Sequence, residues 1–232
     1  MKLAIMQPYF LPYVGYFHLI AAADTFVIYD NIKYTKKGWI NRNRILRDGA
    51  AVLFTLPLKH DSDHLNVVQR QLSDGFDQIK LARMFELAYR GAPNFAEVYP
   101  LIEKIIQYDD VNLFEYIYHS VVSLCQYIGI DTDIRISSQL SIDHNLKNQD
   151  KVIEICLNLG ADTYINMVGG SELYSKSCFD AKSILLKFLK PISFEYSQFG
   201  LPFVPGLSII DLLMFNPIGE IRTNIREKYE LI

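Results

Sequence analysis

The sequence KLAIMQPYFLPYVGYFHLIAAADTFVIY, residues 2–29, decides the fold class. Residues 2–6 form a short apolar run that stops at Gln7-Pro8, which is typical of a buried central strand. Residues 15–23 carry apolar side chains at helical spacing, and the β-branched run at residues 25–29 predicts a second strand. The order strand, loop, helix, strand predicts a parallel pair joined by a right-handed crossover.

The rest of the chain extends this pattern. Residues 39–46 and 51–58 should form a β-hairpin around the turn Arg47-Asp48-Gly49, and residues 75–130 should form a helical insertion. Further strands are expected at residues 134–137, 163–165, 185–189 and 193–196, and further helices at residues 148–159 and 208–215. We therefore predict one α/β domain over residues 1–232, with a mainly parallel Rossmann-like sheet, a helical insertion and a β-hairpin.

The composition narrows the class of protein. Hydrophobic residues make up 50% and charged residues 21%, so the chain can bury a core that offsets the entropy of folding. A net charge of −3 argues against a non-specific nucleic-acid binder, which needs a basic excess. No stretch approaches the roughly 18 apolar residues of a membrane-spanning helix, and the three separated cysteines fit a reducing compartment. We therefore expect a cytoplasmic protein with no nucleic-acid partner and no transmembrane segment.

The loop after the first strand is the first candidate site. Its polar and aromatic side chains are those of Gln7, Tyr9, Tyr13 and Tyr16. In α/β sheets ligands collect where the carboxyl end of a strand meets the amino end of a helix, because free backbone N–H groups carry a positive partial charge there. We therefore expect an anionic ligand at this loop. The alternative is that the aromatic rings only close the end of the sheet.

The segment from residue 30 to residue 44 is the second candidate site. Its candidate residues are Asp30, Lys37, Trp39, Asn41, Arg42 and Asn43. If Trp39 begins a strand, Asn41 and Asn43 share its face. Arg42 then lies on the other face, where Arg and Lys side chains would contact phosphates. The alternative is a solvated edge strand protected by its lysines.

Three other features of the sequence are weaker candidates for a functional site. Gly169-Gly170-Ser171 permits close backbone approach but does not match a P-loop, so an ordinary turn is the favoured interpretation. His60 and His64 lack a third ligand nearby, so no metal site is expected. Ser208 and Asp211 stand where a helix cap and a favourable first-turn charge are placed.

Four segments together resemble the WbqC-like protein family. They are residues 4–17, which begin with Ala4-Ile5-Met6-Gln7-Pro8, and the segments Gly38-Trp39-Ile40-Asn41-Arg42-Asn43-Arg44-Ile45, Leu159-Gly160-Ala161-Asp162-Thr163-Tyr164-Ile165-Asn166 and Leu207-Ser208-Ile209-Ile210-Asp211-Leu212-Leu213-Met214. The resemblance implies a role in surface-polysaccharide or O-antigen assembly, that is, in lipopolysaccharide biosynthesis. The implied substrate is a sugar nucleotide or an activated group transferred to one. The resemblance also makes Asp211 a candidate substrate-binding residue.

A second resemblance concerns mechanism. Residues 10–16, FLPYVGY, resemble the F-x-P-H-x-G-H loop of nucleotidyltransferases and pantothenate-synthetase-like ligases, which also lies between a first strand and a first helix. It implies a nucleotidyltransferase-like sheet and a nucleotide with Mg²⁺ as cofactor. Tyr13 and Tyr16 stand where that pattern has histidines, and a neutral phenol stabilises transition-state phosphates less. Nucleotide binding could survive this change, whereas adenylyl transfer does not follow from it.

Three hypotheses remain open. The leading one is a transferase of surface-polysaccharide biosynthesis that moves an acyl or aminoacyl group to a nucleotide-linked amino sugar. In this hypothesis Lys37 and Arg42 hold phosphates, Asp30 deprotonates the amine, and the sugar is oriented by Gln7, Tyr13 and Asn41. The second hypothesis is nucleotidyl transfer or adenylate-forming ligation. The third is non-catalytic binding of a sugar nucleotide or another anionic small molecule.

Overall fold

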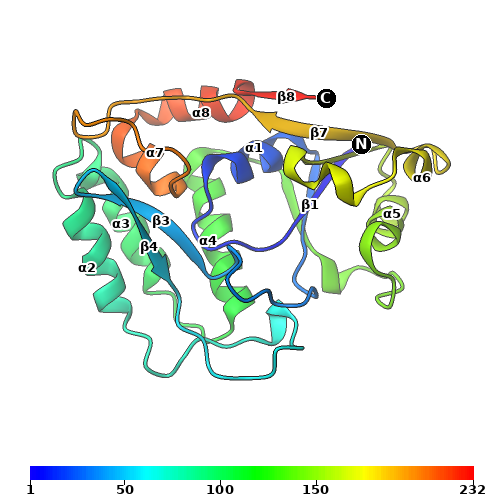
Figure 1. Cartoon of the computed structure of the whole chain (residues 1–232), viewed down its shortest axis with the longest axis horizontal. Helices are drawn as coiled ribbons and strands as arrows, with labels where there is room; N and C mark the ends of the chain where they lie inside the picture. Colours follow the sequence, from blue (N-terminus) through cyan, green and yellow to red (C-terminus); the bar gives the residue numbers. More distant parts are fainter.

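A computed structural model describes residues 1–232, and its centre is a six-stranded sheet (Figure 1). The strands are β1 (Lys2–Met6), β2 (Thr25–Ile28), β5 (Asp133–Ile136), β6 (Thr163–Met167), β7 (Leu185–Pro191) and β8 (Tyr229–Leu231). Their order across the sheet is β5-β2-β1-β6-β7-β8, and every neighbouring pair is parallel except β7 with β8. The predicted α/β class with a mainly parallel sheet is confirmed.

Helices connect the strands and cover both faces of the sheet. The α-helices are α1 (Val14–Ala22), α2 (Gln78–Tyr89), α3 (Phe95–Ile106), α4 (Leu113–Ile128), α5 (Asn148–Leu159), α6 (Lys176–Asp180), α7 (Ile209–Phe215) and α8 (Ile218–Glu227). Three short 3₁₀ helices are η1 (Val67–Gln69), η2 (Ser137–Gln139) and η3 (Val168–Leu173). The predicted helical insertion over residues 75–130 corresponds to α2, α3 and α4.

The central strand β1 alternates between two hydrophobic cores. Ala4 belongs to the larger core, which includes residues of α1 to α4, α7 and α8. Leu3 and Ile5 belong to the smaller core, which lies under α5 and α6. Because both faces of β1 are buried, the strand is a continuous apolar run without alternating polar residues. This explains why the opening residues alone predicted a central strand.

The strand order places a crevice beside β1. From β1 the chain first builds outward through β2 and β5, and it then crosses to the other side of β1 to add β6 and β7. The loops that follow β1 and β6 therefore diverge at the carboxyl edge of the sheet. In doubly wound sheets this reversal of strand order is where ligands bind.

The predicted hairpin is present as a separate two-stranded sheet of β3 (Arg42–Arg47) and β4 (Ala50–Thr55). Asp48 and Gly49 form its turn with φ values of 52° and 74°, the left-handed conformation that tight hairpin turns require. The first strand begins at Arg42 instead of at residue 39, so the prediction that Asn41 and Asn43 share a strand face with Trp39 is wrong. Trp39 packs against the guanidinium groups of Arg42 and Arg44, at 5.7 and 5.2 Å.

Capping side chains fix several helix ends. The Asn112 side chain accepts hydrogen bonds from the backbone N–H groups of Phe114 and Glu115 at the start of α4. The predicted cap at Ser208 is also present, because its Oγ accepts from the N–H of Ile210 at 3.3 Å. At the carboxyl end of α5, Gly160 has a φ of 71°, a left-handed conformation that glycine adopts without strain.

The carboxyl-terminal quarter differs most from the sequence-based expectation. Residues 193–196 form no strand, because β8 takes the pairing position beside β7. The pairing is antiparallel, with Leu189 opposite Leu231 and Pro191 opposite Tyr229. Both α8 and β8 were missing from the prediction.

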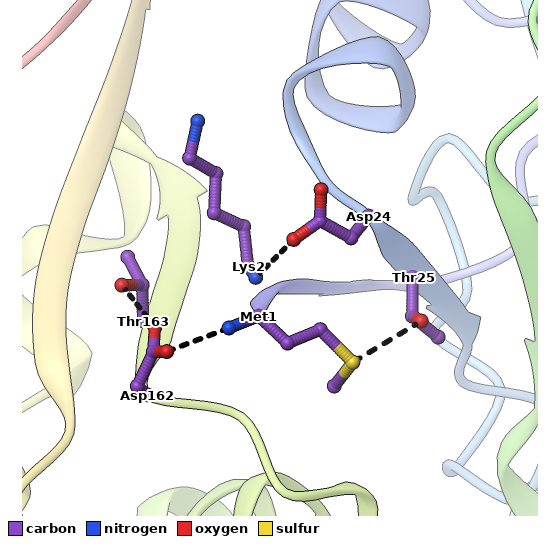
Figure 2. Close-up of polar contacts among 6 residues, drawn as sticks. All are labelled: Met1, Lys2, Asp24, Thr25, Asp162 and Thr163. Atoms are coloured by element: carbon purple, nitrogen blue, oxygen red, sulfur yellow. Dashed lines mark hydrogen bonds and ion pairs between the residues drawn. The ribbon is translucent and has the colours of Figure 1, made fainter.

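Polar groups at the amino edge of the sheet pair with one another (Figure 2). The ammonium group of Met1 lies 2.6 Å from Oδ2 of Asp162, and the backbone N–H of Lys2 donates to Oδ2 of Asp24 at 2.7 Å. Thr163 Oγ1 donates to the other carboxylate oxygen of Asp162 at 2.8 Å. This edge is therefore closed by its own side chains.

No helix of the structure combines the length and the apolar character needed to cross a bilayer.

Candidate functional site

A cavity of about 1200 Å³ lies at the carboxyl edge of the sheet. Its walls come from the loop after β1, the segment after β2, the amino end of α5 and the segment after β6. The cavity therefore occupies the crevice that the strand order creates beside β1. Its size suits a ligand of nucleotide or sugar-nucleotide dimensions.

The charged groups of this cavity are mainly cationic. Lys33, Lys147 and Lys151 line it, whereas Glu172 is its one carboxylate. None of the three lysines takes part in an ion pair. Three ammonium groups with no anionic partner in a concave, partly enclosed site create a field that attracts anions.

Lys151 is the most buried of the three lysines. Its side chain in the first turn of α5 is only 3% exposed. Nζ donates one hydrogen bond, to Oδ1 of Asn31 at 3.2 Å, and lies 4.9 Å from the centre of the Tyr29 ring. Burial lowers the pKa of this amine, and the nearby carboxylate of Asp30 opposes the shift. Two of the three donor positions of the ammonium have no partner in the protein.

Asn31 holds Lys151 and two other residues in place. Its Oδ1 accepts from Lys151 Nζ and from Ser137 Oγ at 2.8 Å. Its Nδ2 lies 3.0 Å from Nδ1 of His144, whose Nε2 lies 3.0 Å from the carbonyl oxygen of Leu140. Because a carbonyl can only accept, Nε2 carries the proton and Nδ1 accepts from the Asn31 amide. The Asn31 carbonyl oxygen must therefore face Lys151.

The amino end of α5 opens onto the cavity without a side-chain cap. Lys147 occupies the cap position and makes no capping hydrogen bond, and it lines the cavity together with Asn148 and Gln149. The Gln149 side chain does not cap the helix, since its Oε1 accepts from the N–H of Ser175, just before α6, at 2.9 Å. Asn148 has a φ of 51°, an uncommon left-handed conformation. The uncapped first turn adds backbone donors and a positive partial charge to the cationic wall.

Aromatic residues form another part of the cavity lining. Tyr9, Tyr13, Tyr29 and Trp39 line the cavity. Burial raises the pKa of both Tyr13 and Tyr29 to about 12, so their hydroxyl groups stay protonated and donate hydrogen bonds near neutral pH. Trp39 is 43% exposed and presents a large ring at the cavity edge. Such rings can stack on a nucleobase or on the apolar face of a sugar.

The predicted loop after β1 does contribute to the cavity. Gln7, Tyr9, Tyr13 and Tyr16 all line it. The Tyr16 hydroxyl donates to the backbone oxygen of Gln7 at 3.0 Å, and its ring is only 2% exposed. Tyr16 therefore stabilises the loop, and Gln7, Tyr9 and Tyr13 are its other polar side chains at the cavity. A side chain at Gly15 would collide with the Tyr13 ring, at 2.3 Å from the nearest atom, so glycine lets this ring keep its position beside α1.

The segment after β6 was interpreted from sequence as an ordinary turn, yet it forms part of this cavity. Asn166, Gly169, Gly170 and Tyr174 line the cavity. Asn166 Nδ2 donates to the hydroxyl oxygens of Tyr164 at 3.0 Å and Tyr174 at 2.7 Å. The position of this segment after a predicted parallel strand was the signal that could have identified it.

Other predicted site residues lie outside the cavity. Asp30 is fully buried below it, where Oδ1 accepts from Ser137 Oγ at 2.7 Å and from Ser138 N–H at 2.9 Å. Lys37 is exposed, and Arg42 donates through Nε to the carbonyl oxygen of Gly38 at 2.7 Å. The structure therefore does not place Asp30, Lys37 or Arg42 on the cavity wall.

Asn41 and Asn43 are also buried away from the cavity. Asn41 Nδ2 donates to the carbonyl oxygen of Leu56 at 2.7 Å, and Asn43 Nδ2 donates to that of Leu11 at 2.7 Å. These bonds fasten the hairpin to neighbouring segments. The loop containing Gln7 and the segment containing Trp39 still converge, because both residues line the same cavity.

Asp211 lies in a separate, closed cluster. Its carboxylate is fully buried and accepts three hydrogen bonds, from the hydroxyls of Tyr89 and Tyr196 at 2.9 and 2.7 Å and from Gln198 Nε2 at 2.6 Å. Burial raises its pKa, and these three donors oppose the shift. Asp211 has no contact with the cavity and joins α7 to α2 and to the segment after β7.

No cluster of three or more His, Cys, Asp or Glu side chains is arranged to hold a metal ion.

The strand order and the cavity define a doubly wound α/β protein with a large cavity at the carboxyl edge of its sheet. Residues 7–223 match the WbqC-like protein family, and the chain belongs to that family. It is also 30% identical over 215 residues to the uncharacterized protein Rv1507c of Mycobacterium tuberculosis. The aligned region covers 91% of this chain and 92% of that protein. No solved structure matches the chain.

Proposed function

We propose that this chain is a transferase that binds a sugar nucleotide in the cavity beside β1 and transfers an acyl or aminoacyl group to an amine of the sugar. The setting of the reaction would be bacterial surface-polysaccharide biosynthesis, as the family resemblance implies. The observation that carries the proposal is the cationic wall of Lys33, Lys147 and Lys151, none of which has an anionic partner.

The chemistry of a sugar nucleotide matches the cationic and the aromatic parts of the cavity lining. A diphosphate would lie against the three lysines and the uncapped amino end of α5, where charge and backbone donors favour oxygen anions. A nucleobase or sugar ring would lie against Trp39 and the neighbouring tyrosines. Side-chain amides of Gln7, Asn31 and Asn166 supply the directional donors and acceptors that distinguish one sugar from another.

Thermal unfolding with a panel of nucleoside diphosphate sugars, free nucleotides and uncharged sugars tests the proposal. A bound ligand at a hundredfold excess over its Kd stabilises the native state by about 2.7 kcal/mol, so a nucleoside diphosphate sugar should raise the Tm and an uncharged sugar should not. The double variant Lys33→Glu, Lys147→Glu should lose this shift. Lys104→Glu, an exposed change on α3, is the matched control and should keep it. Absence of any shift with every nucleotide and sugar nucleotide would refute the proposal.

Nucleotidyl transfer is the second candidate function. The FLPYVGY segment runs from the loop after β1 into the first turn of α1, next to the cavity, and the loop it resembles also joins a first strand to a first helix. This reaction would release pyrophosphate from ATP or CTP with Mg²⁺ when an acceptor sugar is present. Pyrophosphate release would favour it over acyl transfer, and an unchanged bound ligand in mass spectrometry would favour a non-catalytic binding protein.

A further inference from the structure

The cavity contains one amine whose surroundings differ from those of an ordinary lysine. Lys151 Nζ is buried, forms no ion pair and contacts only a neutral amide oxygen and the face of an aromatic ring. A buried ammonium without a carboxylate partner is costly, so the neutral amine is favoured relative to a solvated lysine. Lys33 and Lys147 line the same cavity but are exposed to water.

We propose that Lys151 accepts the proton that the attacking amine must lose during transfer, an inference that rests on the proposed function. The acceptor nitrogen attacks the carbonyl carbon of an activated acyl donor such as a thioester. The N–C bond forms, the C–S bond breaks, and the sulfur leaves with the electron pair. The proton from the nitrogen passes to Lys151 Nζ, which then returns it to the departing thiolate.

Other groups in the cavity are less suited to this step. Asp30, the base predicted from sequence, is fully buried and does not line the cavity, and its Oδ1 accepts from Ser137 and Ser138. Both ring nitrogens of His144 are occupied, one by Asn31 and one by the Leu140 carbonyl. Burial raises the pKa of the cavity tyrosines Tyr9, Tyr13, Tyr29 and Tyr174, so these hydroxyls are poor proton acceptors.

Asn31 orients the amine for this role. The His144 ring fixes the Asn31 amide with its oxygen toward Lys151, and that oxygen then receives one N–H of the amine. The lone pair of neutral Nζ is thereby left for a substrate proton. The charged and titratable groups that face Nζ are Asp30 and Tyr29 from the segment after β2 and His144 from the loop before α5. Only Asp30 carries a full charge that favours the ammonium.

Trace acetylation of the purified chain across a pH series, with mass spectrometry of each lysine, tests the inference without a known substrate. Lys151 should reach half-maximal acetylation at a lower pH than Lys33 and Lys147 in the same molecules. Asn31→Asp would place a carboxylate 3.2 Å from Nζ and should move the Lys151 midpoint upward. A Lys151 midpoint equal to or above those of Lys33 and Lys147, or no acetylation of Lys151 at any pH, would overturn the proposal.

Lys151→Arg separates the proton-acceptor role from phosphate binding. Arginine keeps the positive charge but stays protonated, so the sugar nucleotide that raised the Tm should still bind, whereas turnover should fall by about a hundredfold or more. Unchanged turnover in Lys151→Arg would overturn the inference. If no sugar nucleotide binds at all, the proposed function fails, and the acetylation series still decides the state of Lys151. If a sugar nucleotide binds but Lys151 titrates like its exposed neighbours, only the inference fails.

Discussion

Two clusters of buried polar side chains, one around Asp211 and one around Lys151, use their hydrogen-bonding capacity differently. The Asp211 carboxylate accepts three hydrogen bonds from protein donors and has no cavity beside it. The Lys151 amine makes one hydrogen bond and lies in the wall of the cavity at the carboxyl edge of the sheet. A polar residue whose partners all belong to the protein stabilises the fold, whereas one with unused donors at a cavity is available to a ligand.

Removal of Asp211 should produce the largest loss of stability. Asp211→Ala leaves the hydroxyls of Tyr89 and Tyr196 and the amide of Gln198 without their shared acceptor. Each buried donor left unpaired costs about 1 to 3 kcal/mol, so we expect the free energy of unfolding to fall by about 3 to 5 kcal/mol. Urea denaturation measures this change. A variant as stable as the wild type would show that the cluster does not stabilise the fold.

Lys151→Met should have the opposite pattern, with an effect on turnover and little effect on stability. The substitution replaces a buried amine by an apolar side chain of similar length, which is neutral or stabilising when no ion pair is lost. Because the variant lacks the group that accepts the substrate proton, turnover should fall by about a hundredfold or more. A turnover assay together with urea denaturation measures both quantities. A large loss of stability would place Lys151 in the same class as Asp211.

Asn43 tests whether a residue first nominated as substrate-binding is structural. Asn43→Ala removes the bond to the Leu11 carbonyl and the acceptor of the Arg44 N–H. We expect a loss of about 1 to 3 kcal/mol in the free energy of unfolding and an unchanged affinity for the ligand of the cavity. Calorimetric titration measures the affinity, and urea denaturation measures the free energy of unfolding. Weaker ligand binding at unchanged stability would instead support a role for Asn43 in substrate binding.

The smallest effect is expected at the amino edge of the sheet, where the polar pair is exposed. The hydrogen bond from the Met1 ammonium holds the pKa of Asp162 below its ordinary value. Because the folded pKa is lowered, this contribution to stability is fully present above the ordinary aspartate pKa and disappears as the pH falls through the lowered value. Asp162→Asn should therefore be slightly less stable than the wild type near pH 7 and equally stable in strong acid. A difference that grows as the pH falls would contradict this sign.

The sequence predicted the parts of the fold that depend on local periodicity. The run at residues 2–6, the helix at residues 148–159 and the cap at Ser208 each follow from spacing or from one side chain. The prediction was wrong where long-range pairing decides the outcome, since β8 takes the edge of β7.

The site was predicted only in part, for a related reason. The loop containing Gln7 was found because it follows the first strand of the sheet. Lys151 was missed because its sequence context is that of an ordinary amphipathic helix, and burial beside Asn31 depends on contacts 120 residues apart. Asn41 and Asn43 were nominated by residue type and Asp211 by the family resemblance, and neither criterion shows whether their bonds are already satisfied within the fold.

The central claim is that unpaired lysines at the carboxyl edge of the sheet form an anion site, and labelling with pyridoxal 5′-phosphate tests it most directly. This anionic aldehyde forms an imine with a lysine amine and releases water, and borohydride then reduces the imine to a stable adduct that peptide mass spectrometry locates. We expect adducts at Lys33, Lys147 and Lys151, with protection by a nucleoside diphosphate sugar. Adducts spread over surface lysines in proportion to their exposure, with no protection of the cavity, would contradict the account.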